Sequence, residues 1–195
     1  MSLSHVKSWL SQETSTKLQT DILSEVSSFL KTQLTYNKGW PARADKGHKM
    51  ARFGDPSVTY TYKDKQKQVL PWTPSLQVVR DLVTTHMNGW QPNCVVVNTY
   101  APQSGLYPHN DSKYIPQLGN FPTIVSVSFG ETRSFRIFPL NEKKKRTSSY
   151  VDYALQHGDL FVMSGDFDVN NHHSIPEEPH LKFDRLSLTF RLHNV

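Results

Sequence analysis

The chain has 195 residues, a formal net charge of +5 and a pI of about 9.3. This length predicts one domain with a sizeable core, and no apolar run is long enough to cross a membrane. The charge is mild, so it favours a polyanionic partner without establishing one. The single cysteine, Cys94, excludes an internal disulfide. Because the start also lacks a secretory signal, we expect a reducing compartment, the cytoplasm or the nucleus. We also expect a monomer.

The first predicted element is an amphipathic helix over residues 13–34, with Ser11 or Thr14 as its N-cap. Its apolar side chains recur at helical spacing: Leu18, Ile22, Val26, Phe29 and Leu30. This face either packs against the domain, which is the favoured interpretation, or binds a partner. Residues 36–57 show no clear period and are expected to form a long loop or short strands.

A second helix is predicted over residues 74–87, since Pro74 suits a first helical turn and Gly89 a C-cap. Its apolar face consists of Leu76, Val79, Leu82 and Val83. Short segments with strand character are punctuated by glycine and proline: 59–62, 94–100, 106–109, 122–129, 133–138, 148–155, 159–163 and 185–192. This pattern predicts an α+β, mainly β protein with a double-stranded β-helix (jelly-roll) core and its N-terminal helices packed on one sheet.

Two clusters of basic residues have open interpretations. Lys63, Lys65 and Lys67 are spaced two apart, which suits a phosphate-facing edge or a solvated hairpin that protects a sheet edge. The run Lys-Lys-Lys-Arg at 143–146 lies between two predicted strands. A solvated turn and a contact with a nucleic-acid backbone explain this run equally well.

A candidate metal site begins with His109 and Asp111. In an extended segment these two side chains point to the same face and can hold one ion. His172 and His173 follow further along the chain, and only one of two adjacent strand residues can face that ion. Two histidines and one carboxylate with open positions form the facial triad that binds Fe(II) in non-haem oxygenases. His157, before Gly-Asp, suits a structural turn instead.

The last predicted strand carries a polar row. Alternation places Arg185, Ser187, Thr189 and Arg191 on one face and the apolar residues between them on the other. Such a row inside a barrel suits a buried dicarboxylate, because a guanidinium can bind a carboxylate with two charge-assisted hydrogen bonds.

The ordered set His109-x-Asp111, His173 within His-Ser-Ile-Pro, and Arg185-x5-Arg191 resembles the AlkB family of Fe(II)/2-oxoglutarate dioxygenases. Further matches are Asn98-x-Tyr100, Ser-Val-Ser-Phe-Gly at 126–130, His-Gly-Asp-Leu-Phe-Val-Met at 157–163, and Phe-Gly-Asp at 53–55 followed by Thr-Tyr-Thr-Tyr at 59–62. The resemblance covers roughly residues 50 to 192, and the set is far more specific than any one motif.

The resemblance implies a catalytic centre in which His109, Asp111 and His173 bind Fe(II), with 2-oxoglutarate as cosubstrate and O2 as oxidant. It implies that Arg185 holds the distal carboxylate of 2-oxoglutarate. Further cosubstrate contacts are expected from Asn98, Tyr100, Ser187 and Arg191, with Arg191 nearer the metal. It also implies a substrate side on which Tyr62 stacks on the target base, with Tyr60 and Lys113 as neighbouring contacts.

We expect one dioxygenase domain over residues 1–195. Within it, residues 1–50 form an N-terminal extension of helix and loop, and residues 51–92 form a substrate-facing lid with the second helix. Residues 93–195 form the jelly-roll catalytic core.

Two positions depart from the family pattern. Lys113 stands where the family usually has an acidic residue that helps to read a cationic base such as 1-methyladenine or 3-methylcytosine. An ammonium group there would repel such a base, so either Lys113 points to solvent or the substrate is neutral. Ser187 stands where some members have an asparagine that assists the cosubstrate.

The favoured function is oxidative demethylation of alkylated DNA or RNA, in which an N-methyl group is hydroxylated and released as formaldehyde, with succinate and CO2 as co-products. An AlkB-like oxygenase acting on a protein or small molecule is the alternative, and Lys113 is its best support. A non-catalytic binding module fits poorly with a complete metal and cosubstrate set. The choice between DNA and RNA, and excision from a larger polyprotein, stay open.

Overall fold

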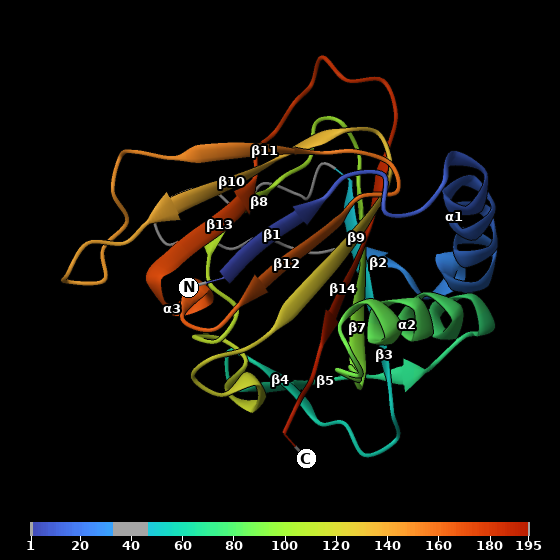
Figure 1. Cartoon of the computed structure of the whole chain (residues 1–195), viewed down its shortest axis with the longest axis horizontal. Helices are drawn as coiled ribbons and strands as arrows, with labels where there is room; N and C mark the ends of the chain where they lie inside the picture. The colour runs from blue at the N-terminus through green and yellow to red at the C-terminus, as the bar shows by residue number, and fades with distance from the viewer. Residues whose placement is uncertain (1, 33–46, 195) are drawn as a thin grey trace.

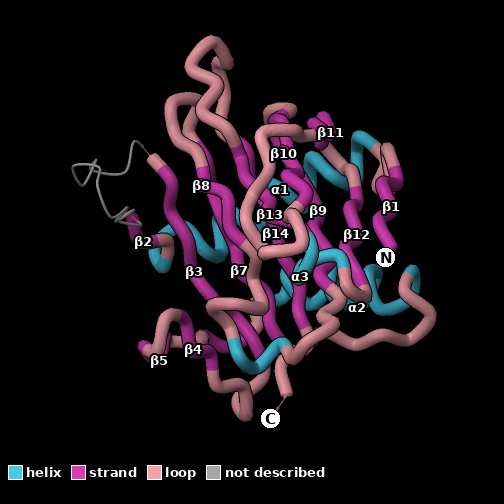
Figure 2. The backbone as a smooth tube through the Cα atoms, turned by 90° about the vertical axis from the view of Figure 1, so that its left-hand side faces the viewer, coloured by secondary structure: helices cyan, strands magenta, loops and turns pink. Residues whose placement is uncertain are grey.

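The computed structural model describes residues 2–32 and 47–194, which fold around two packed β-sheets (Figure 1). The larger sheet has the order β1-β12-β9-β14-β7-β3-β2, with β6 paired to β3. Its strands are β1 (Ser2–Val6), β2 (Lys31–Thr32), β3 (His48–Gly54), β6 (Leu70–Pro71), β7 (Cys94–Tyr100), β9 (Ile124–Gly130), β12 (Leu160–Ser164) and β14 (Arg185–Arg191). Figure 2 shows these strands side by side from β2 across to β1.

The smaller sheet has the order β11-β10-β13-β8. Its strands are β8 (Leu106–His109), β10 (Arg133–Pro139), β11 (Val151–Leu155) and β13 (Asn171–Ile175). A separate hairpin pairs β4 (Tyr60–Tyr62) with β5 (Lys65–Lys67). The two sheets confirm the predicted jelly roll, and the helices α1 (Gln12–Val26) and α2 (Pro74–His86) lie together on the outer face of the larger sheet (Figure 1).

The larger sheet separates an apolar layer from a polar one. The alternate residues Leu186, Leu188 and Phe190 of β14 join the outer core, which also includes buried side chains of both helices. The residues between them, beginning with Arg185 and ending with Arg191, therefore face the smaller sheet. This arrangement confirms the predicted polar row. A second apolar cluster, with Phe135, Ile137 and Ile175 from the smaller sheet, fills part of the space between the sheets.

The helix α1 packs on the domain, which resolves the two interpretations of its apolar face. Leu18, Ile22 and Val26 are buried in the outer core, and the Ser11 side chain accepts a hydrogen bond from the backbone N–H of Thr14, as expected of an N-cap. The predicted end at residue 34 was wrong. The α-helix ends at Val26, where serines replace good helix formers, and one 3-10 turn (Ser27–Phe29) follows.

The segment 36–57, expected to form a long loop or short strands, contains the seven-residue strand β3, and its residues 36–46 lie outside the described chain. The strands β1 and β13 were not predicted, because serine, asparagine and histidine dominate them. The strand expected at 148–155 begins only at Val151.

The strand β1 is fixed at the edge of the larger sheet by a buried carboxylate. Its His5 Nε2 lies 2.8 Å from Asp159 Oδ2. Asp159 also accepts hydrogen bonds from the backbone N–H groups of Ser8 and Gln156, at 2.9 Å each. In the part of the chain that the structure describes, no helix is long and apolar enough to span a membrane.

The packing of α1 can be tested with Ile22→Ala. Ile22 is fully buried, so its truncation should lower the free energy of unfolding by about 2–5 kcal/mol. Thr20→Ala, at an exposed position of the same helix, is the matched control and should change it by less than about 1 kcal/mol. Urea unfolding followed by circular dichroism measures both; an unchanged midpoint for Ile22→Ala would contradict the core role of this helix.

Candidate metal and cosubstrate site

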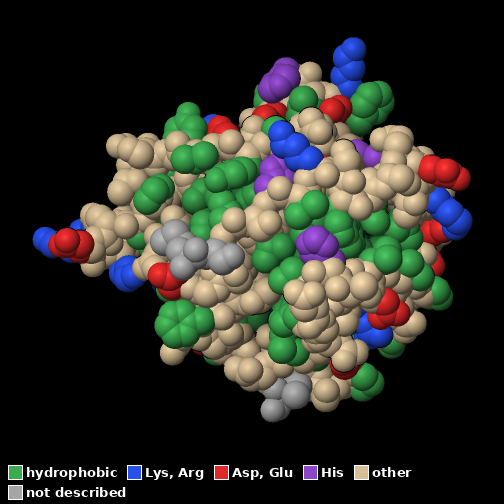
Figure 3. Space-filling view, in the orientation of Figure 1, with side chains coloured by type: hydrophobic (Ala, Val, Ile, Leu, Met, Phe, Trp, Pro, Cys, Tyr) green, Lys and Arg blue, Asp and Glu red, His purple; other side chains and the backbone are tan. Residues whose placement is uncertain are grey.

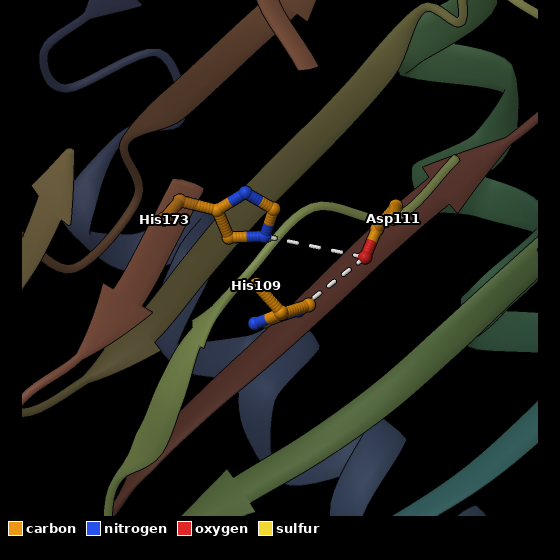
Figure 4. A group of neighbouring side chains, drawn as sticks. All are labelled: His109, Asp111 and His173. Carbon is orange, nitrogen blue, oxygen red and sulfur yellow. Dashed lines mark ion pairs between the residues drawn. The ribbon is translucent and has the colours of Figure 1, made fainter. Parts of the chain in front are cut away.

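Three side chains converge between the two sheets, at one end of the polar row (Figure 4). His109 ends β8, Asp111 follows it by two residues, and His173 on β13 is the register partner of His109. Their ligand atoms all lie within 4.8 Å of one another. Asp111 Oδ1 is 3.4 Å from His109 Nε2 and 4.0 Å from His173 Nε2. Strand alternation turns His172 to the opposite face, so His173 completes the group.

Both imidazoles are oriented to present Nε2. His109 Nδ1 lies 2.8 Å from the carbonyl oxygen of Tyr107, and a proton donated there leaves the Nε2 lone pair for a metal. The His173 ring stacks on Phe135, with centroids 5.3 Å apart. Burial and the neighbouring His109 lower the pKa of His173 to about 3, so this imidazole is neutral at physiological pH.

The carboxylate of Asp111 is held by Arg191. The guanidinium Nε and Nη2 donate to Asp111 Oδ2 at 2.9 Å and 2.5 Å, while Oδ1 faces the histidines. Burial alone would raise the pKa of Asp111, but Arg191 and the two histidines outweigh it and hold the pKa well below its usual range. One oxygen of a permanently ionised carboxylate thus joins two imidazole nitrogens, a donor set that fits Fe(II) with open positions.

A second carboxylate, Asp168, which was not predicted, positions the loop that carries Asp111. It lies in the short helix α3 (Phe167–Asn170) and is buried. Its oxygens accept hydrogen bonds from the backbone N–H groups of Asp111, at 2.9 Å, and Ser112, at 2.8 Å. Burial and the charge of Asp111 raise the pKa of Asp168. No motif marks this residue, because its partners are backbone amides.

The candidate cosubstrate residues lie on two neighbouring strands. Arg185 is the register partner of Tyr100, and Ser187 is the partner of Asn98. Arg185 is buried, donates to Ser128 Oγ at 2.9 Å, and has an Nε with no hydrogen-bond partner in the structure. Burial lowers its pKa to about 10. A buried guanidinium with an unused donor and no ion-pair partner in the described chain fits an incoming carboxylate.

Two residues that were not predicted shape this end of the site. His48 stacks on Tyr100, with centroids 4.5 Å apart, and its Nε2 lies 3.0 Å from Asn98 Oδ1. No motif marks His48, because it lies in the segment 36–57, which shows no clear period. Arg133 is fully buried and donates to the carbonyl oxygens of Ala101, Ser104 and Pro176, which fixes the loops around the site.

The predicted substrate residues lie under and along the β4–β5 hairpin. Tyr60 is buried, with 3% of its surface exposed, and its ring lies 4.7 Å from the guanidinium of Arg52. Tyr62 is half-buried, and its ring lies 5.7 Å from that of Tyr114. Lys113 is exposed, with Nζ 5.6 Å from the Tyr114 ring. The structure therefore places both Tyr62 and Lys113 next to Tyr114, and it buries the side chain of Tyr60.

Comparisons with known proteins agree with this geometry. A family model for the 2OG-Fe(II) oxygenase superfamily matches residues 2–191. The chain is 32% identical over 178 residues to DNA oxidative demethylase ALKBH2 of Bos taurus, and 30% identical over 179 residues to that of Homo sapiens. These alignments cover 86% of this chain but only 63% and 67% of the two relatives. The solved structure of OsALKBH1 matches with a TM-score of 0.62, at 22% identity and 97% coverage of both chains, a likeness of fold.

The role of Asp168 can be tested with Asp168→Asn. An amide keeps the shape but replaces one acceptor oxygen with a donor that faces a backbone N–H, so the loop carrying Asp111 should lose its fixed position. We expect divalent metal to bind about 10–100-fold more weakly, as for other residues that support a ligand. Calorimetric titration with Co(II) or Mn(II) measures this affinity. Asp152→Asn, in a surface ion pair, is the control. Equal metal affinity of the two variants would show that Asp168 does not support the metal site.

Proposed function

The chain belongs to the AlkB family within the 2OG-Fe(II) oxygenase superfamily, and from this premise we propose that it oxidatively removes N-alkyl groups from nucleic-acid bases. The observation that carries the proposal is the convergence of His109, Asp111 and His173 at one end of the polar row, with the buried guanidinium of Arg185 and its unused donor at the other end. The two ALKBH2 relatives are named as DNA oxidative demethylases, which supports a nucleic-acid substrate.

His109 Nε2, His173 Nε2 and Asp111 Oδ1 would hold the iron. When bound, Fe(II) supplies oxidation of a C–H bond with O2 and 2-oxoglutarate, giving succinate and CO2. A hydroxylated N-methyl group is an unstable hemiaminal that loses formaldehyde and restores the base. Arg191 keeps Asp111 ionised and leaves only one of its oxygens directed at the metal.

Arg185 would bind the distal carboxylate of 2-oxoglutarate. Its position on β14, inside the barrel and opposite Tyr100, excludes water that would weaken the ion pair. Asn98 and Ser187 lie one step closer to the metal on the same face. The cosubstrate would therefore span the polar row from Arg185 toward the three metal ligands.

The target base would be flipped from its stack and lie against Tyr62, near the hairpin. Burial, followed by the charge of Asp111, raises the pKa of Tyr62 to about 12, so the phenol stays neutral. Tyr60 is too buried to stack on a base and forms the wall beneath.

A hollow beside the metal loop offers a place for the nucleic-acid backbone. It has a volume of about 400 Å³, and no carboxylate is among its lining residues: Asn110, Ser112, Lys113, Gly119, Asn120, Leu140, Lys144, Val169 and His172. Of the run 143–146, only Lys144 lines this hollow, and its Nζ is held 2.6 Å from Asn170 Oδ1. The β10–β11 loop that carries the run projects from the molecule, and basic side chains lie at its tip (Figures 1 and 3). An ammonium fixed by neutral acceptors keeps its charge for a phosphate.

The oligomeric state and the cellular compartment can also be inferred. We infer a monomer in the cytoplasm or nucleus. The support for the reducing compartment is the buried free thiol of Cys94, whose pKa burial raises to about 12, as suits an inert cysteine.

The test of the function is incubation with methylated DNA and RNA oligonucleotides, Fe(II), ascorbate and 2-oxoglutarate. Formaldehyde and succinate should form in equal amounts. Asp111→Ala should abolish both, because it removes the only carboxylate ligand. Thr20→Ala, outside the site, should retain full activity. Succinate formed only with peptides or metabolites would instead support an oxygenase with another substrate.

A contact of Lys144 with the nucleic-acid backbone predicts that neighbouring lysines differ in their effect on oligonucleotide binding. Lys144→Ala should weaken binding of an oligonucleotide and reduce the slope of log affinity against log salt by about 0.7–0.9, one phosphate contact. Lys143→Ala and Lys145→Ala remove the same charge outside the hollow and should change the slope less. Fluorescence anisotropy at several salt concentrations measures the slopes. Equal effects of all three variants would favour the solvated-turn interpretation of the run.

A further inference from the structure

Two exposed lysines lie over the tyrosine pair that borders the proposed base site. Lys63 Nζ is 5.5 Å from the Tyr62 ring centroid and 5.1 Å from that of Tyr114. Lys113 Nζ is 5.6 Å from the Tyr114 ring. The position of Lys63 is fixed by the backbone: Lys63 and Asp64 form the two-residue turn of the hairpin, both with positive φ, and Lys63 N–H donates to the Tyr114 carbonyl oxygen at 3.2 Å.

A third cation, Arg52 on β3, lies behind the hairpin, over the ring of Tyr60. Its Nη2 donates to the weak acceptor Met50 Sδ at 3.2 Å, and among the described residues its buried Nε has no hydrogen-bond partner. Burial raises the pKa of Tyr60, so its phenol stays neutral beneath the Arg52 guanidinium.

No acid offsets these three charges. In the described part of the chain, no carboxylate lies within ion-pair distance of Arg52, Lys63 or Lys113. The one carboxylate of the metal site, Asp111, already has an oxygen bound by Arg191. A base stacked on Tyr62 would lie near these positive charges, which is the environment that a positively charged base avoids.

We propose that the enzyme prefers neutral alkylated bases whose alkylated nitrogen is flanked by two carbonyl groups, such as 3-methylthymine or 3-methyluracil, over cationic bases such as 3-methylcytosine. A carbonyl oxygen of the base would accept a hydrogen bond from Arg52. The exocyclic amino group of 3-methylcytosine is itself a donor, so it would meet other donors without an acceptor. This inference rests on the proposed function and adds the class of base.

The experiment compares kcat/KM for 3-methylthymine and 3-methylcytosine in the same oligonucleotide sequence. The two bases differ in charge but carry the same N3-methyl group, so contacts with the rest of the strand cancel in the ratio. The wild type should favour 3-methylthymine. In water, a change of one unit charge at a distance of about 5 Å changes the ratio of kcat/KM values about threefold. Lys113→Glu or Lys63→Glu changes two unit charges and should therefore move the ratio about tenfold toward 3-methylcytosine. Arg52→Met should selectively lower activity on 3-methylthymine.

Lys65→Glu is the matched control. It makes the same change of charge on an exposed residue of the same hairpin, without a ring contact, and should leave the ratio within about threefold of the wild type. Preference of the wild type for 3-methylcytosine, or a ratio that Lys113→Glu and Lys63→Glu leave unchanged, would overturn the inference alone. No formaldehyde from either base, or from any other methylated oligonucleotide, would overturn the proposed function as well.

Discussion

The pairing of Arg191 with Asp111 is the contact on which the site depends. It joins the last residue of β14 to the loop after β8, so it connects the larger sheet to the smaller one at the metal site. It also assigns different tasks to the two carboxylate oxygens, since Oδ2 is bound by the guanidinium and Oδ1 faces both histidines. Without that division, the carboxylate could rotate away from the shared ion position.

The larger sheet serves stability and chemistry through the two faces of the same strands. On β14, the apolar residues anchor the helices, and the alternate polar residues form the row that ends at the metal site. A register shift of one residue would exchange the two sets and destroy both. Pairing with β7 on one side and β9 on the other, over all seven residues of β14, prevents such a shift.

The sequence was informative wherever function required a fixed spacing. His109, Asp111, His173 and Arg185 were predictable because strand alternation and ordered motifs determine their faces. Residues that act through partners distant in the chain were not: Asp168 contacts backbone amides, and His48 lies in a segment without a clear period. The bounds of strand β3 could not be predicted within that segment, because Lys49 and Arg52 interrupt its apolar pattern, and Arg52 does so because it faces the polar side of the sheet.

The strand β1 has a protective role at the sheet margin. It covers the backbone of β12 along five paired residues, and the buried Asp159 holds it there through His5. Without this cover, β12 would present unpaired N–H and C=O groups beside the apolar side chains of Phe161 and Met163, a template on which other chains could assemble into aggregates. Affinity tags or cleavage sites placed within these first residues would therefore endanger the solubility of the protein before they affected its chemistry.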